Sequence, residues 1–454
     1  MKLSLYCLTV GLMFTGVSPA YARAQPSSPD EYRVVDTLEI DKVPSWFPVG
    51  FCLLTQGQDQ YAAYYNEKHH MTVAHRQVKD SRWQKVTLPS QIAWDSHNYI
   101  TMVLDTAGDI HLSGNMHGVP LIYFRTRIPG DITTFEKRGM TGKEEQRCTY
   151  PRFMKTTDGT LLYMYRSGGS GNGRRFYNRY DVQTQTWSRL FDSPLFEGEG
   201  KRNAYPIGPL KGPAGLYHLV WVWRDTPDCA TNHHLSYAVS SDLIQWTAAD
   251  GQPLELPIML NQTRAYVDPI PSGGGIINGC ERLVFDAKNR PIVAYHKRDK
   301  NNHMQIFIAR FQEGRWHPKA VTAWDKEIPF SGRGAMPFIG VKLGQVRTLP
   351  KNLIAVDYRH RDYGSGRILL DKGTLHPVDT QVMIPTAIPK NLTKPTIRFA
   401  GIRAKLAQDL GEPSEPDRKY MLRWETLEAH HDRPRQPPLP PASTLKLITL
   451  ERVR

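Results

Sequence analysis

The residues best suited to chemistry in this sequence are histidines, tyrosines and arginines that recur on either side of short turns. A hairpin places the first residue of one strand and the last residue of the next at the same edge of a sheet, so paired residues should lie side by side. Imidazole and phenol groups can transfer protons, and a phenol beside a guanidinium is suited to that task. The pattern comprises His97 with His117, Tyr150 with Arg166, Tyr205 with Arg224, and His296 alone.

The clearest example is the segment 149–173. Tyr150 precedes a β-prone run, Asp158-Gly159 is a turn signal, and a second run ends at Arg166 before the stretch SGGSGNG. Taken alone, this pair is more simply explained as the cap of a sheet edge. Similar spacings in the neighbouring segments would bring all the paired side chains to one rim, which favours a polar binding site over a structural role.

An internal repeat indicates how these segments are positioned. An aromatic residue that opens a short strand after a polar turn recurs about every 50 to 70 residues, at Trp83, Phe135, Trp187, Trp246 and Trp316. Such periods are typical of β-propeller blades. Two further blades fit near 340–385 and 400–450, so we expect an all-β, seven-bladed β-propeller. A strand at 33–40 would complete the last blade and close the ring.

The C-terminal region is less regular. Residues 401–412 could form a short helix, and 420–435 reads as a strand followed by a charged loop. A stiff, proline-rich loop is expected near 434–441. Residues 445–450 read as the last strand.

The N-terminus predicts export. Residues 1–22 combine a positive residue, an apolar run and an A-x-A site, which is typical of a signal peptide cleaved after Ala22. A polar linker at 23–33 and a single domain at 34–454 follow. The protein is therefore expected to be secreted or periplasmic. We expect no membrane association, since no other stretch is long and apolar enough to span a bilayer.

The net charge of the chain indicates which kind of molecule it could bind. The 454 residues carry a formal net charge of +14, and the basic residues are scattered along the chain. No nucleic-acid-binding signature is recognisable, so no nucleic-acid partner is expected. For an exported protein, an anionic polysaccharide fits this charge best. We expect the protein to be a monomer.

Cysteine and histidine residues leave two questions open. The cysteines after residue 22 (Cys52, Cys148, Cys229 and Cys280) could form disulfides or remain buried thiols. A structural zinc or calcium ion is conceivable, although no paired ligand spacing supports it. The residues of suitable type for zinc are Cys229, His233, His234, Cys280 and His296.

Several motifs resemble a known family. They include SHNYITMVLDTAGDIHLSGNMH at 96–117, MTGKEEQRCTYPRF at 140–153, YRSGGSGNG at 165–173, WVWR at 221–224 and AYHKRD at 294–299. Together they resemble the BNR-repeat proteins that include ulvan lyases and related rhamnose–glucuronate lyases. The resemblance covers most of the chain after residue 22. It implies a seven-bladed propeller and an enzyme that cleaves a uronate-containing polysaccharide by β-elimination, with no cofactor required for the chemistry.

The resemblance also implies roles for the paired residues. Tyr150 would protonate the leaving oxygen and, in a syn elimination, would also abstract the C5 proton. His117 or His97 would be the general base. Arg166, helped by Arg224, would neutralise the uronate carboxylate and keep the pKa of Tyr150 low. The substrate-binding residues would be Tyr205, Arg224 and His296.

Two other functions stay open at this stage. A propeller glycoside hydrolase could remove rhamnose from glucuronate, although it would usually need two carboxylates, and Glu144-Glu145 is the only obvious acidic pair near the rim. A non-catalytic glycan-binding propeller is the other alternative. The sequence does not determine the exact glycan, its sulfation, endo or exo action, or whether one residue serves as both acid and base.

Overall fold

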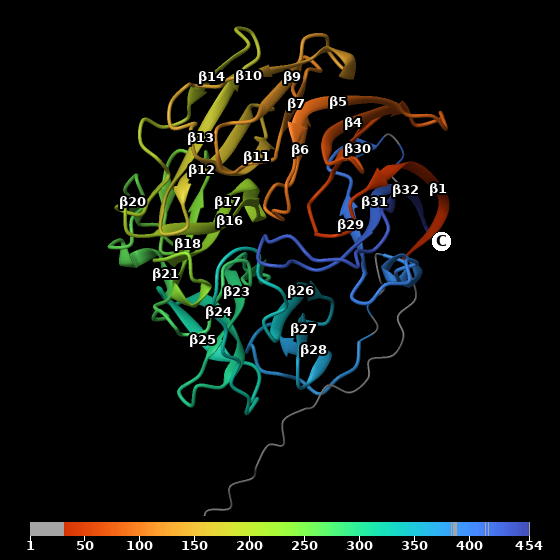
Figure 1. Cartoon of the computed structure of the whole chain (residues 1–454). Coiled ribbons are helices and arrows are strands. Elements are labelled where there is room, and N and C mark those ends of the chain that lie inside the picture. The colour runs from red at the N-terminus through yellow and green to blue at the C-terminus, as the bar shows by residue number, and fades with distance from the viewer. Residues whose placement is uncertain (1–30, 383, 385–387, 414, 416, 454) are drawn as a thin grey trace, which may run out of the picture.

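The structure is a computed structural model that describes residues 31–382, 384, 388–413, 415 and 417–453. In this part of the chain the regular structure is almost entirely β, with seven separate sheets and five short 3-10 helices. Figure 1 shows the sheets following one another around the molecule in chain order, until the red N-terminal strand meets the blue C-terminal strands. The all-β prediction is therefore confirmed.

The strands of the first three sheets include His117, Tyr150 and Arg166, whereas His97 lies in a loop between two of these sheets. The first is formed by β2 (Cys52–Gly57), β3 (Asp59–Tyr65), β4 (His70–Gln77), β5 (Gln84–Gln91) and β30 (Glu412–Pro413). The second is formed by β6 (Thr101–Leu104), β7 (Ile110–Ser113), β9 (Tyr123–Thr126) and β10 (Phe135–Arg138). The third is formed by β8 (His117–Val119), β11 (Cys148–Lys155), β12 (Leu161–Gly169), β13 (Asn172–Asp181), β14 (Thr186–Arg189) and β15 (Phe196–Glu197).

The remaining sheets complete the molecule. The fourth is formed by β16 (Asn203–Lys211), β17 (Tyr217–Arg224), β18 (Asn232–Ser240), β19 (Trp246–Thr247), β20 (Pro253–Leu254) and β21 (Tyr266–Asp268). The fifth is formed by β22 (Arg282–Phe285), β23 (Pro291–Arg298), β24 (Met304–Gln312) and β25 (Arg315–Ala320). The sixth is formed by β26 (Val341–Leu349), β27 (Leu353–His360) and β28 (Gly364–Asp371). The seventh is formed by β1 (Tyr32–Val43), β29 (Arg403–Gln408), β31 (Arg418–Thr426) and β32 (Ser443–Arg452).

Short 3-10 turns link some of these strands. They are η1 (Ile132–Thr134), η2 (Pro213–Gly215), η3 (Cys229–Thr231), η4 (Thr263–Ala265) and η5 (Lys390–Thr393). Within the described ranges, no helix has the length and apolar character needed to cross a membrane.

The core lies between neighbouring sheets. Met164 of β12 and Trp221 of β17 belong to one buried cluster, so the third and fourth sheets pack face to face. Ile292 of β23 and Val356 of β27 share another cluster between the fifth and sixth sheets. Burying one large apolar side chain contributes about 1.5–3 kcal/mol. Packing therefore fixes the positions of the loops that carry the polar pairs.

The two ends of the described chain meet in one sheet. β1 pairs antiparallel with β32 over almost its whole length, from Tyr32 opposite Arg452 to Val43 opposite Ser443. The strand predicted at 33–40 is thus present and begins at Tyr32, inside the segment expected to be a linker. The predicted signal peptide lies outside the described residues. This pairing makes β32 an inner strand of the sheet and leaves β1 as one of its edges.

The predicted helix at 401–412 is wrong. Residues Arg403–Gln408 form β29, which pairs antiparallel with β31. Ile402, Leu406 and Leu410 have the four-residue spacing of a helix face. Pairing with a neighbouring strand nevertheless decides the conformation, because it supplies the backbone hydrogen bonds of the segment.

The other expectations for the fold have clear outcomes. The strand after residue 420 lies within β31, and the last strand lies within β32. The recurring aromatics lie in or next to β5, β10, β14, β19 and β25, one in each of five successive sheets. Cys52, Cys148, Cys229 and Cys280 are free, buried thiols.

Candidate active site

Tyr150 and Arg166 lie together, as the hairpin pattern predicts. β11 and β12 pair antiparallel with Thr149 opposite Arg166, and the register shifts between Thr149 and Arg152. Tyr150 occupies this bulge. Its ring centroid lies 4.9 Å from the guanidinium carbon of Arg166, a cation–π distance.

The backbone of Tyr150 is strained. Its φ is +59°, in the left-handed region that side chains other than glycine rarely adopt. Such conformations cost about 1–3 kcal/mol and concentrate at functional sites. The bulge therefore directs this phenol at an energetic cost, which supports a functional role for Tyr150.

Arg166 lies beneath the two tyrosines and is only 2% exposed. Its Nη2 donates to Thr149 Oγ1 at 3.1 Å and its Nη1 donates to Tyr205 Oη at 3.5 Å. Arg224 lies on the other side of Tyr205, with its guanidinium carbon 5.6 Å from the ring centroid. Two guanidinium groups therefore flank the Tyr205 phenol.

The pKa of Tyr150 is raised in the structure, whereas the sequence analysis expected it to be low. Burial and the neighbouring Tyr205 raise the pKa of Tyr150 above its ordinary value, and Arg166 opposes the shift without overcoming it. Burial also acts to raise the pKa of Tyr205, but Arg166 and Arg224 together hold that pKa below its ordinary value. Tyr150 is thus a protonated phenol at neutral pH, and the arginines favour the phenolate at Tyr205 instead.

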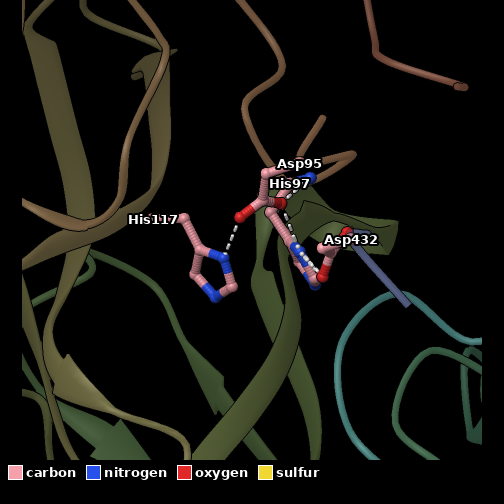
Figure 2. A group of neighbouring side chains, drawn as sticks. All are labelled: Asp95, His97, His117 and Asp432. Atoms are coloured by element: carbon pink, nitrogen blue, oxygen red, sulfur yellow. Dashed lines mark hydrogen bonds and ion pairs between the residues drawn. The ribbon is translucent and has the colours of Figure 1, made fainter. Parts of the chain in front are cut away.

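His97 and His117 form a cluster with two aspartates (Figure 2). The Nδ1 atom of His97 lies 2.9 Å from Asp95 Oδ1 and 3.1 Å from Asp432 Oδ2. His117 Nδ1 forms a short hydrogen bond with the other carboxylate oxygen of Asp95. The centroids of the two imidazole rings are 4.3 Å apart. Asp95 thus orients both histidines, and Asp432 adds a second negative charge at His97.

The carboxylates determine the charge of the cluster. Burial would lower the pKa of His97, but hydrogen bonds and charge from Asp432 and Asp95 raise it to about 9. Despite partial burial, the two histidines hold the pKa of Asp95 well below its ordinary value. The two carboxylates therefore favour the imidazolium form of His97 at neutral pH.

The sequence analysis missed both aspartates. Asp95 is two residues before His97 in WDSHN, and its backbone-to-side-chain turn with His97 is a local signal that could have identified it. Asp432 lies 336 residues from Ser96, whose backbone N–H it accepts at 3.1 Å. It also accepts from the Ala335 N–H at 2.8 Å. Nothing in the local sequence indicates such a contact.

A cavity of about 460 Å³ lies beside the candidate residues. His97, Tyr150, Arg224 and His296 line it, whereas His117, Arg166 and Tyr205 are not among its lining residues. The described lining residues include six Lys or Arg side chains and a single carboxylate, Glu428. Such a lining attracts an anionic ligand.

His296 is a buried wall residue of this cavity. Its Nδ1 lies 2.9 Å from the Gly275 carbonyl oxygen, and the side chain is fully enclosed. Burial lowers the pKa of His296 to about 4. A neutral imidazole in this position can donate or accept a hydrogen bond but carries no charge for an anionic ligand.

The suggested zinc ligands do not form one cluster. His233 bonds to Asp225 and His234, whereas Cys229 and Cys280 line the cavity. Among the residues that the structure describes, the only metal-ligand group of three or more members is Asp95, His97, His117 and Asp432. Its ligand atoms lie within 4.8 Å of one another, which is compatible with a structural metal ion, and hydrogen bonds join them in this structure.

The sequence relatives are ulvan lyases, and each match covers only a segment of the two proteins. The long isoform from Pseudoalteromonas sp. (strain PLSV) is 57% identical over 132 residues, which are 27% of this chain and 13% of that protein. The short isoform from Alteromonas sp. (strain LOR) is 38% identical over 144 residues, 29% of this chain and 27% of that protein. The matches thus span only a minor part of these relatives.

Solved structures share the fold. The crystal structure of polysaccharide lyase Uly1 is similar with a TM-score of 0.60 and 13% identity, over 92% of this chain and 99% of that one. A PL25 ulvan lyase bound to -[GlcA(1-4)Rha3S]- is similar with a TM-score of 0.53 and 14% identity, over 94% and 96%. The family model for BNR repeat-containing family members matches residues 59–324. Since this is more than half of the chain, the chain belongs to the BNR repeat-containing family.

Proposed function

We propose that the protein is an exported polysaccharide lyase that cleaves ulvan-like, rhamnose–glucuronate or iduronate glycans by β-elimination at the uronic acid. The observation that carries this proposal is the basic cavity in which a protonated tyrosine, a cationic histidine and an arginine meet. The names of the relatives support the substrate class, as does the ligand -[GlcA(1-4)Rha3S]- of the similar structure.

The fold in this proposal is a seven-bladed β-propeller. Seven sheets in chain order and the pairing of β1 with β32 support it. The proposal also includes the signal peptide at 1–22, a secreted or periplasmic location, and a monomeric state. Loops from several blades would then surround one binding cavity.

Arg224 is the proposed partner of the uronate carboxylate. It lines the cavity, where Asn278 Oδ1 accepts from its Nη1 at 3.5 Å. Neutralising the carboxylate makes the C5 proton more acidic, because the carbanion that forms next to it is stabilised. In this proposal Arg166, which does not line the cavity, instead supports Tyr150 and Tyr205.

His117 is the proposed general base. Its Nδ1 is bonded to Asp95, so the carboxylate fixes the tautomer whose Nε2 lone pair is free to accept a proton. His97, in contrast, is already protonated and adds positive charge beside the reacting carboxylate. In this assignment, base and acid are two different residues.

Tyr150 is the proposed general acid. His117 takes the C5 proton, the released electron pair forms the C4–C5 double bond, and the bond between C4 and the glycosidic oxygen breaks. Tyr150 donates its phenolic proton to that leaving oxygen. A raised pKa suits this role because it keeps the phenol protonated before the reaction.

For the hydrolase alternative, the structure places two carboxylates at His97 and one, Glu428, in the cavity, where it is paired with Arg403. Asp95 and Asp432 both bind His97, and the low pKa of Asp95 keeps its carboxylate ionised. A glycosidase needs one carboxyl group that is protonated and free to face the glycosidic oxygen. Neither aspartate meets that requirement.

Product analysis separates the alternatives. Elimination produces a 4,5-unsaturated uronate and adds no water, whereas hydrolysis incorporates one water per cleaved bond. We expect mass spectrometry of an ulvan digest in ¹⁸O-water to show unsaturated products without solvent oxygen at the cleaved bond. Saturated products carrying ¹⁸O would identify a hydrolase, and binding without cleavage would identify a non-catalytic module.

A further inference from the structure

The cavity has a second group of basic lining residues, which come from other strands than the candidate catalytic residues. Lys342 and Arg359 lie directly across from each other on β26 and β27. Arg403 and Lys405 are two residues apart on β29, so their side chains project from the same face of the strand. All four line the cavity that also contains Tyr150, and all four are exposed.

These cations are not balanced by acidic side chains. Glu428, the single acid among the described lining residues, forms an ion pair with Arg403. Arg359 stacks on Phe338 at 4.2 Å from the ring centroid. For Lys342 and Lys405, the described residues include no ion-pair or hydrogen-bond partner. Like charges placed opposite each other destabilise a sheet, so this arrangement is unfavourable when the cavity contains only water.

The surroundings of Lys405 show the same imbalance. Desolvation of the ammonium group at the end of this otherwise exposed side chain lowers its pKa, repulsion from Lys342 and Arg403 lowers it further, and the weaker attraction of Glu428 opposes these shifts. An anion between these side chains would relieve the repulsion and form charge-assisted hydrogen bonds. No packing requirement explains why two lysines from different sheets converge here.

We propose that Lys342 and Lys405, with Arg359, form a second anion subsite that holds a sulfate ester or a further carboxylate of the sugar chain. This subsite is separate from the place of the cleaved uronate beside Arg224 and rests on the proposed function. It would set the register of the polymer, because two anionic groups of the sugar chain would be held at once. Its residues bind and orient the substrate without contacting the reacting atoms.

The test is the double variant Lys342→Gln/Lys405→Gln. On sulfated ulvan we expect KM to rise about tenfold, the usual scale for losing charged hydrogen bonds, while kcat stays within about twofold. The matched control is Lys137→Gln/Lys300→Gln, which removes the same charge from exposed positions outside the cavity. It should leave both constants unchanged.

Chemically desulfated ulvan identifies the bound group. A KM effect that disappears on this polymer assigns a sulfate, and an equal effect on both polymers assigns a carboxylate. Unchanged KM on both polymers, with an active wild-type enzyme, would overturn the subsite. If the wild type cleaves neither polymer, the lyase proposal fails. Calorimetric binding of the same polymers would then test the subsite, and an unchanged Kd in the double variant would refute it.

Discussion

At the scale of single residues, Tyr150 has the most specific role. Tyr150→Phe removes only the phenolic hydroxyl, for which the described residues show no hydrogen bond. We expect kcat to fall by at least ~10²-fold, the contribution of one proton-transfer group, while KM and the thermal midpoint stay near wild type. Initial rates and thermal denaturation measure these quantities. Tyr32→Phe in β1 is the matched control, and near-normal turnover of Tyr150→Phe would exclude the residue as the acid.

The charge of His97 gives a prediction on pH. Its folded pKa of about 9 is above the ordinary value, so its protonation stabilises the fold fully below about pH 6.5 and this stabilisation is lost as pH rises through about 9. Activity should fall over the same alkaline range. In Asp432→Asn, one of the two carboxylates at His97 is neutral, and we expect the alkaline limb of kcat/KM to move about one pH unit lower.

The pH profile of the exposed control variant Asp379→Asn should match the wild type. An alkaline limb that stays in place in Asp432→Asn would show that His97 does not control the profile. The variant should also lose part of its stability at neutral pH, because Asp432 accepts backbone hydrogen bonds from Ser96 and Ala335. Comparing thermal midpoints with pH profiles therefore separates the two effects.

Of the seven site residues predicted from the sequence, His97, Tyr150, Arg224 and His296 line one cavity, whereas His117, Arg166 and Tyr205 do not. The charge states could not be inferred, because they depend on burial and on partners distant in sequence. A phenol next to an arginine suggested a low pKa, yet burial has the larger effect on Tyr150.

At the scale of elements, the glycine-rich turn after Arg166 is tightly constrained. Gly168 has φ of +95°, and a Cβ there would lie 2.2 Å from the Asn172 carbonyl oxygen. Gly168→Ala should therefore destabilise the protein by about 1–3 kcal/mol. Gly169→Ala is the matched control, since its Cβ would meet nothing closer than 3.8 Å. Urea denaturation of both variants tests this, and equal stability would contradict the strained turn.

The hairpin at 149–173 was predictable because local signals determine it: an Asp-Gly turn and two β-prone runs. The bulge at Tyr150 was not, since a register shift depends on how β11 meets both β12 and β8. At 401–412, in contrast, a local signal led to a wrong prediction of a helix. Its apolar spacing fits a helix, but the adjacent strand β31 determines the conformation.

At the scale of the whole molecule, the net charge of +14 matters chiefly where it gathers around the cavity. Salt screens such interactions, with a Debye length of about 10 Å at 0.1 M. We expect KM for ulvan to rise severalfold between low salt and ~0.5 M NaCl while kcat changes little, as measured by initial rates. A salt-independent KM would contradict an electrostatic role for the basic lining.

The repeat of aromatic turns predicted the succession of sheets, because each sheet is formed mainly by local strand pairing. Contacts between distant segments were harder to predict. The strand at 33–40 was correctly expected to complete the last sheet, whereas the contact of Asp432 with His97 depends on two loops from opposite ends of the chain. No periodic pattern records a contact of that kind.

The central claim is that this cavity catalyses β-elimination at a uronate. The most direct test is the ultraviolet absorbance of purified protein mixed with ulvan, because only elimination creates a double bond conjugated to the carboxylate. The account predicts a steady rise in absorbance with the wild type and a rise at least ~10²-fold slower with Tyr150→Phe. Release of free rhamnose or shortened chains without any rise in absorbance would contradict it.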